Sequence, residues 1–169
     1  VFLTDVRVPK TNRVGEENDG WTVAKYLLEF ERGGGFYTGR INVNLARLRK
    51  LAAEAGCLDD PAFQKRVAEL EVEAQSISVS ELRRLSALTT GQNPGASASI
   101  IRLRGSEATQ KATELTMEAA GLYALPFEQL EQVVDGGNEP GVSTPDEASS
   151  AGRYYGFRAA TIFGGSSEV

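Results

Sequence analysis

The chain has 169 residues, of which 41% are hydrophobic, and its 18 Lys and Arg against 23 Asp and Glu give a formal net charge of −5. An acidic chain without a basic stripe cannot neutralise many phosphates, which argues against nucleic-acid binding. The absence of His and the single Cys exclude His-based triads, the common zinc sites and an internal disulfide. The lone Cys57 indicates a reducing, cytoplasmic compartment, and no apolar run approaches the roughly 20 residues of a membrane-spanning helix.

The first eighteen residues predict a strand and a turn region. Residues 1–8 alternate apolar and polar side chains and stop at Pro9, which is typical of a short β-strand. A polar segment containing Gly15 follows. One strand cannot form a sheet, so we expect its partners outside this chain. Because the chain also lacks an initial Met and stops within a Gly-Gly-Ser-Ser stretch, we expect a fragment of a longer protein.

A helical pattern of apolar residues runs from Asp19 to about Ala55, where Gly56 is a plausible stop. This pattern crosses three consecutive glycines at positions 33–35. Each glycine inside a helix costs roughly 1 kcal/mol relative to alanine. We therefore expect another group to approach this backbone closely.

Glu31 lies just before the glycine triplet and is the first candidate for chemistry. Its neighbours at helical spacing are Leu27, Leu28, Gly34 and Gly35. Glu31 therefore lies on an apolar stripe that becomes free of side chains. Glu29, in contrast, has a Lys one turn behind it and an Arg ahead of it, as in a solvated surface pair. The alternative for Glu31 is the same kind of surface pairing.

The second predicted helix begins at Asp60 and Pro61 and reaches about Leu88. Its apolar residues recur at spacings of four and three, which is typical of a helix in a bundle. This seam comprises Phe63, Val67, Leu70, Ala74 and Ile77, and continues with Leu82, Leu85 and Leu88.

Two more helices complete the pattern. The third runs from about Ala96 to Gly121, with a face of Ile101, Ala108, Ala112, Leu115 and Ala119 whose small residues allow close helix packing. The fourth starts at a capping box formed by Thr144 and Glu147 and continues to about Phe163. The predicted fold class is mainly α, with a short β remnant followed by an up-and-down four-helix bundle.

Motifs at both ends of the chain point to one family. Residues 6–9 read VRVP, residues 14–21 read VGEENDGW, Glu31 is followed by Arg32, and residues 158–169 read RAATIFGGSSEV. Together they resemble the acyl-CoA dehydrogenases, whose VRVP strand and VGEENxGW segment precede the C-terminal domain and whose terminal motif is RAxTIYGGSSEI. The resemblance implies that residues 1–18 are the end of the middle β-domain and its linker. Residues 19–169 would form the C-terminal helical domain, truncated at its end.

The resemblance implies a flavin-dependent α,β-desaturation of an acyl-CoA thioester, with FAD as cofactor. A carboxylate removes the α-proton, and hydride passes to the flavin. Many members of the family carry this base at the position of Gly164, which has no side chain here. The isovaleryl-CoA and long-chain branches carry it immediately before an arginine in the first C-terminal helix, which is the position of Glu31. Arg32, Gly34 and Gly35 are then assigned to substrate binding, because the bare glycines leave room for an acyl group.

The resemblance also implies a flavin-binding set in the terminal motif, which comprises Gly164, Gly165, Ser166 and Glu168. Glu118 falls where the family usually has a glutamine that faces a neighbouring subunit's flavin, and the alternative for it is a surface acid. The family's Arg-x-x-Phe-Gly stretch has no counterpart in residues 48–61, so its flavin-binding role is not transferred to Arg47 or Arg49.

The expected partners are an acyl-CoA substrate, an electron-transfer flavoprotein or similar acceptor, and further subunits in a homo- or hetero-oligomer, either a dimer or a tetramer. No membrane or nucleic-acid partner is expected. A second interpretation is a structural subunit that has lost its chemistry, which Gly164 favours and Glu31 opposes. A third, a helical interaction module, explains the periodicity but leaves the terminal motif without a purpose.

Overall fold

A computed structural model describes residues 1–31, 37–92, 95–126, 141–163 and 166–167, without the side chains of residues 29–31. The described residues form five α-helices and no β-strand, which confirms the mainly helical class. The helices are α1 (Gly20–Glu31), α2 (Tyr37–Glu54), α3 (Pro61–Thr89), α4 (Ser97–Ala120) and α6 (Pro145–Arg158). None of the helices within these ranges is long and apolar enough to cross a membrane.

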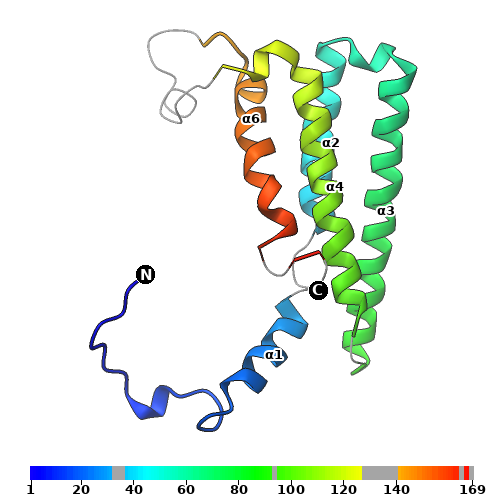
Figure 1. The fold of residues 1–169 in the computed structure, drawn as a ribbon. Coiled ribbons are helices and arrows are strands. Elements are labelled where there is room, and N and C mark those ends of the chain that lie inside the picture. The colour runs from blue at the N-terminus through cyan, green and yellow to red at the C-terminus, as the bar shows by residue number, and fades with distance from the viewer. Residues whose placement is uncertain (32–36, 93–94, 127–140, 164–165, 168–169) are drawn as a thin grey trace.

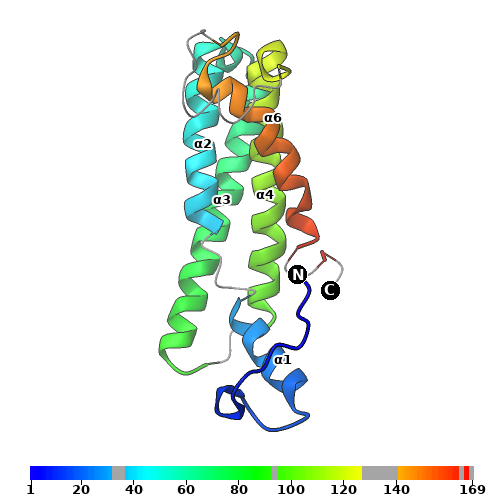
Figure 2. The ribbon, with the colours of Figure 1, turned by 90° about the vertical axis from the view of Figure 1, so that its left-hand side faces the viewer.

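Four of the helices, α2, α3, α4 and α6, lie side by side and alternate in direction (Figures 1 and 2). We call them the helical body. α4 is its central member, because it packs against α2, α3 and α6. The terminal segment that follows α6 returns to the end of the helical body at which α2 begins (Figure 1).

The core of the helical body confirms most of the predicted seams. Every residue of the seam from Phe63 to Ile77 is buried, and so is every residue predicted for the face of α4. They pack against a row of α2 side chains that comprises Ile41, Leu45, Leu48 and Leu51. Each large aliphatic side chain that is fully buried contributes about 1.5–3 kcal/mol through removal from water.

The predicted extension of the α3 seam is wrong at Leu82 and Leu85, which are exposed. The backbone N–H of Tyr37, the first residue of α2, donates to the carboxylate of Glu81 at 2.8 Å. α2 therefore begins level with Glu81, and the rest of α3 runs past it (Figures 1 and 2). Apolar periodicity continues along α3, but the described α2 is no longer beside it to cover those side chains.

The helix boundaries follow local capping chemistry. Asp60 accepts a hydrogen bond from the backbone N–H of Ala62 at 2.9 Å, one residue after the proline that opens α3. Thr144 and Glu147 form both bonds of the predicted capping box at the start of α6. Gly121 ends α4 with a φ of 56° and a ψ of −132°, a backbone conformation that glycine adopts without strain and other residues rarely adopt. These three boundaries are confirmed.

Residues 1–31 form an arm that extends away from the helical body (Figures 1 and 2). We call it the N-terminal arm. Most of its apolar side chains are exposed, among them Phe2, Trp21 and Leu27, whereas Val23 and Leu28 are half-buried. The strand predicted for residues 1–8 has no neighbouring strand among the described residues and stays a prediction. The predicted continuity of the first helix across the glycine triplet falls on residues 32–36, outside the described residues.

Candidate functional site

Arg158, the first residue of the terminal motif, ties α6 to α4. One terminal nitrogen of its guanidinium group donates to the carbonyl of Gln110 at 3.1 Å and to the hydroxyl of Thr113 at 3.2 Å. The other pairs with the carboxylate of Glu114 at 2.6 Å, and the group lies over the ring of Tyr154, 4.3 Å from its centroid. The planar fork of arginine suits this set of contacts, and lysine cannot reproduce it.

Two side chains of α4 hold the segment that follows. Arg102, with only 7% of its surface exposed, donates to the carbonyl of Phe163 at 2.7 Å. The side-chain amide of Gln110 donates to the carbonyls of Phe157 and Arg158 at 3.1 and 3.2 Å. Carbonyls in the last turn of a helix lack their usual intrahelical donors, and the bonds from Gln110 supply donors to the last two carbonyls of α6. The chain is therefore fixed to α4 up to the two glycines of the motif.

The start of α2 lies against the same part of α4. The ring of Tyr37 packs so closely on Gly105 that a Cβ atom at position 105 would lie 2.3 Å from its Cγ. Arg40, one turn further on, has its guanidinium carbon 5.6 Å from the ring centroid of Tyr37 and 6.0 Å from that of Phe157 in α6. The beginning of α2, the first half of α4 and the end of α6 thus converge.

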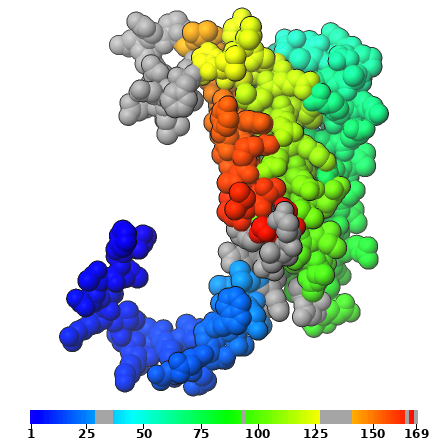
Figure 3. All heavy atoms as spheres, viewed as in Figure 1, coloured from blue at the N-terminus to red at the C-terminus, as the bar shows by residue number. Residues whose placement is uncertain are grey.

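Glu31 is the last residue of α1, and its side chain lies outside the described structure. The C-terminal end of α1, the start of α2 and the terminal segment lie at the same end of the helical body (Figures 1 and 2). In the space-filling view the end of α1 lies just below the red terminal segment (Figure 3). The fold therefore brings the backbone of Glu31 and the terminal motif, which are far apart in sequence, to one end of the molecule.

Most of the other predicted site residues lie outside the described residues. They are Arg32, Gly34, Gly35, Gly164, Gly165 and Glu168. Ser166 is described and is half-buried. Its neighbour Ser167 has a buried Oγ atom without a hydrogen-bond partner among the described residues. An unpaired buried hydroxyl costs about 1–3 kcal/mol, so a polar ligand atom would stabilise this segment.

Ser167 is thus a candidate in addition to the flavin-binding set predicted from the sequence. Its signal was present, because it stands beside Ser166 in the same Gly-Gly-Ser-Ser stretch. A polar cofactor atom at the terminal segment would give the Oγ of Ser167 a partner. Within the described residues, no group of three or more Asp, Glu, His or Cys side chains is arranged to hold a metal ion.

Glu118 does not join this end of the molecule. It lies sixteen positions after Arg102 on α4, a rise of about 24 Å along the helix. Its exposed carboxylate forms an ion pair with Arg66 of α3, one contact of which measures 2.9 Å. The hydrogen bond to Glu118 raises the pKa of Arg66. This environment matches the alternative of a surface acid, and the role of Glu118 toward a neighbouring subunit stays a prediction.

Comparison with known proteins identifies the family. The model of the family described as "Acyl-CoA dehydrogenase, C-terminal domain" matches residues 18–169, which include Glu31 and the whole terminal motif. The chain belongs to the acyl-CoA dehydrogenase family. This confirms the resemblance of the motifs, while the position of the catalytic base stays a prediction.

Several curated relatives carry the same family name. The acyl-CoA dehydrogenase IpdE1 of Mycolicibacterium smegmatis is 27% identical over 172 residues, which cover 100% of this chain and 38% of the relative. IpdE1 of Mycobacterium tuberculosis is 29% identical over 177 residues, covering 100% of this chain and 40% of that protein. The acyl-CoA dehydrogenase FadE34 of M. tuberculosis is 32% identical over 120 residues, which are 71% of this chain and 17% of the relative. The chain thus spans about two-fifths of the length of the IpdE1 proteins.

Proposed function

We propose that this chain is part of a flavin-dependent acyl-CoA dehydrogenase that desaturates an acyl-CoA thioester between its α and β carbons. The observation that carries the proposal is the convergence of the end of α1, the start of α2 and the terminal segment at one end of the helical body (Figure 2). A base at Glu31 and a cofactor held by the terminal motif would then act on the same substrate. Membership of the family supports this chemistry.

In this proposal Glu31 removes the α-proton of the thioester. Bound FAD would supply the acceptor for the β-hydride. Arg32, Gly34 and Gly35 would line the acyl group, and the bare glycine backbone would let a bulky chain lie close to Glu31. Gly164, Gly165, Ser166 and Glu168 would hold the flavin, together with the unpaired hydroxyl of Ser167. Arg102, Gln110 and Arg158 would position this set, because they fix to α4 the segment that ends just before Gly164.

The remaining assignments complete this proposal. Residues 1–18 would be the end of the middle β-domain and its linker, and residues 19–169 would be the C-terminal domain, with the helical body as its up-and-down four-helix bundle. The protein would act in the cytoplasm as a homo- or hetero-oligomer, a dimer or a tetramer, and would pass its electrons to an electron-transfer flavoprotein or a similar acceptor. The exposed apolar side chains of the N-terminal arm support contacts with a further domain or subunit.

The substitution Glu31→Gln in the full-length protein tests the assigned base. Glutamine keeps the size of the side chain but cannot accept the α-proton, so we expect the rate of flavin reduction by acyl-CoA to fall by about 10²-fold or more. The flavin content should stay at the wild-type level. Glu29→Gln, two residues earlier on α1, is the matched control and should leave the rate unchanged. Turnover of Glu31→Gln at the wild-type rate would show that the base is elsewhere.

A second candidate function is a non-catalytic structural subunit of a heteromeric acyl-CoA dehydrogenase. Gly164 favours it, because the position where many members carry their base has no side chain. The measurement is the flavin content of the full-length wild-type protein, purified alone and with its partner subunit. A flavin-free protein that assembles with an active partner would support this second function against the first.

A further inference from the structure

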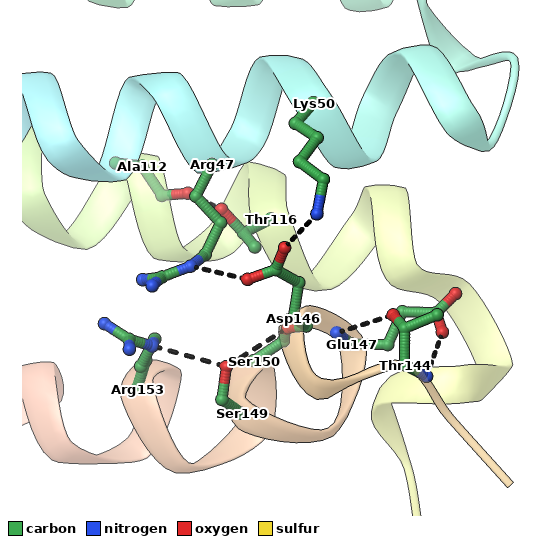
Figure 4. Close-up of polar contacts among 10 residues, drawn as sticks. All are labelled: Arg47, Lys50, Ala112, Thr116, Thr144, Asp146, Glu147, Ser149, Ser150 and Arg153. Carbon is green, nitrogen blue, oxygen red and sulfur yellow. Dashed lines mark hydrogen bonds and ion pairs between the residues drawn. The ribbon is translucent and has the colours of Figure 1, made fainter.

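A polar cluster joins α2 to the first turns of α6, away from the residues assigned above (Figure 4). Asp146, in the first turn of α6, accepts hydrogen bonds from Nε of Arg47 at 3.1 Å and from Nζ of Lys50 at 2.7 Å. The bond from Lys50 is the main reason that the pKa of Asp146 lies below its ordinary value. Further along α6, Nε of Arg153 donates to Oγ of Ser149 at 3.4 Å, which is a long contact.

Among the described residues, the cations of this cluster outnumber the acids that act on them. The three cations are Arg47, Lys50 and Arg153, and the acids that act on them are Asp146 and Glu54. The carboxylate of Glu147, also drawn in Figure 4, accepts instead from the backbone N–H of Thr144. The pKa of Arg153 lies below its ordinary value, first because the group is partly buried and second because Arg47 is positively charged. Two guanidinium groups thus lie close enough to repel each other in a half-buried place.

Both guanidinium groups have donors to spare. Arg47 uses its Nε for Asp146, and its Nη1 is buried without a hydrogen-bond partner among the described residues. Arg153 uses only its Nε for the long contact with Ser149 among those residues. Figure 4 shows the Nη ends of both side chains on the same side of Asp146, directed away from it, one from each helix. Buried donors of charged groups are costly to leave unpaired.

We propose that Arg47 and Arg153 bind a phosphate group between α2 and α6. A phosphate oxyanion would accept from the second Nη of Arg47 and from the Nη donors of Arg153, and would offset the positive charge of the two guanidinium groups. Guanidinium groups suit this role, because their fixed fork of N–H donors matches the spacing of phosphate oxygens. Asp146 is a positioning residue here, since it holds Nε of Arg47 and so sets the direction of its Nη edge. The site is independent of the proposed desaturation.

The source of the phosphate defines two arms of the test. Binding of inorganic phosphate and of ADP to the full-length protein is measured by calorimetry at low ionic strength, where exposed charges are least screened. Similar affinities indicate a site for a free phosphate ion, and an ADP affinity at least tenfold higher indicates a nucleotide diphosphate. Either result supports the proposal when Arg153→Gln lowers the affinity. If Arg153→Gln binds as tightly as the wild type, the ligand lies at another site, such as the one proposed for FAD or acyl-CoA, and the proposal is overturned. Neither readout depends on flavin reduction, so failure here leaves the assignment of Glu31 untouched.

The variant Arg153→Gln removes one of the two ligands. We expect it to weaken binding roughly tenfold or more, because hydrogen bonds to charged groups are the strong ones. Arg49→Gln is the matched control: it removes the same charge from α2, but Arg49 is exposed and pairs with Glu71 of α3. It should change the affinity by less than about twofold, as expected for a distant surface charge.

Thermal unfolding gives a second readout that does not need a calorimetric signal. A ligand that binds only the folded state raises the Tm, so phosphate should stabilise the wild type and Arg49→Gln but not Arg153→Gln. If Arg153→Gln does not fold, Arg153→Lys keeps the charge, loses the fork and should still bind more weakly. The proposal is overturned if neither phosphate nor ADP binds the wild type, or if Arg49→Gln loses as much affinity as Arg153→Gln.

Discussion

The helical body and the N-terminal arm treat the same kind of side chain in opposite ways. Leu48 of α2 is 0% exposed, whereas Leu27 of α1 is 61% exposed, although both belong to one apolar helical pattern in the sequence. The helices of the body cover one another's apolar faces. The face of α1 that carries Leu27 has no comparable cover among the described residues. Periodicity thus predicts that a helix forms, but not what covers it.

The largest expected loss of stability comes from Leu48→Ala in the chain of residues 1–169. Removal of a fully buried leucine side chain leaves a cavity between α2 and its neighbours, and should lower the free energy of unfolding by about 2–5 kcal/mol. Leu27→Ala makes the same chemical change on the exposed arm and should cost less than about 0.5 kcal/mol. Urea unfolding followed by circular dichroism measures both.

The same pair in the full-length protein sharpens the comparison. If residues outside this chain cover the apolar face of α1, Leu27→Ala should lower the free energy of unfolding clearly in the full-length protein. The loss caused by Leu48→Ala should be the same in both. Equal costs for the two variants in the chain of residues 1–169 would contradict the distinction between body and arm.

A second pair of variants tests the contact that places the start of α2. Gly105→Ala puts a methyl group where the Cβ and ring atoms of Tyr37 now lie. Overpacking of this kind costs up to about 3 kcal/mol, against a gain of about 1 kcal/mol in helix propensity, so we expect a net loss of about 2 kcal/mol. Gly39→Ala is the matched control, because an added Cβ at Gly39 meets no atom within 4 Å. It should be neutral or stabilise the chain by up to about 1 kcal/mol in urea unfolding.

Much of the helical body was predictable, because its signals are local. The cap at Asp60, the capping box at Thr144 and the stop at Gly121 each depend on a few neighbouring residues. The buried seam of α3 from Phe63 to Ile77 follows from spacing along one helix. The structural role of such residues can be predicted from a short segment of sequence.

Residues whose role depends on distant partners could not be predicted from the sequence. Leu82 and Leu85 continue the periodicity of α3 but lie beyond the point where the described α2 begins. Ser167 looks like its neighbour in sequence, and only the fold shows that its hydroxyl is buried and unpaired. Arg47 and Asp146 are 99 positions apart, so no local pattern announces their contact. Of these residues, Ser167, Arg47 and Asp146 belong to the candidate sites.

The smallest expected change in stability concerns one ion pair in the helical body and one in the N-terminal arm. Asp146→Asn removes a carboxylate that holds Arg47 and Lys50, and leaves the half-buried Arg47 without its anion. We expect a loss of about 1–2 kcal/mol at pH 7 in urea unfolding, because hydrogen bonds between charged groups are among the stronger ones. Glu17→Gln in the N-terminal arm removes an exposed acid that pairs with Arg13 at 3.5 Å, and should change stability by less than about 0.5 kcal/mol.

The pH dependence of the difference in stability between the wild type and Asp146→Asn gives a sharper test. Because the pKa of Asp146 is lowered in the folded state, the unfolded chain takes up this proton more readily, and the contribution of the carboxylate is complete above its unfolded pKa of about 3.9. It is lost as the pH falls through the folded value. The wild type should therefore be more stable than Asp146→Asn at pH 7, and the difference should shrink to nothing in strong acid. A difference that persisted unchanged at low pH would mean that asparagine disturbs packing between α2 and α6, rather than removing a charge that holds them together.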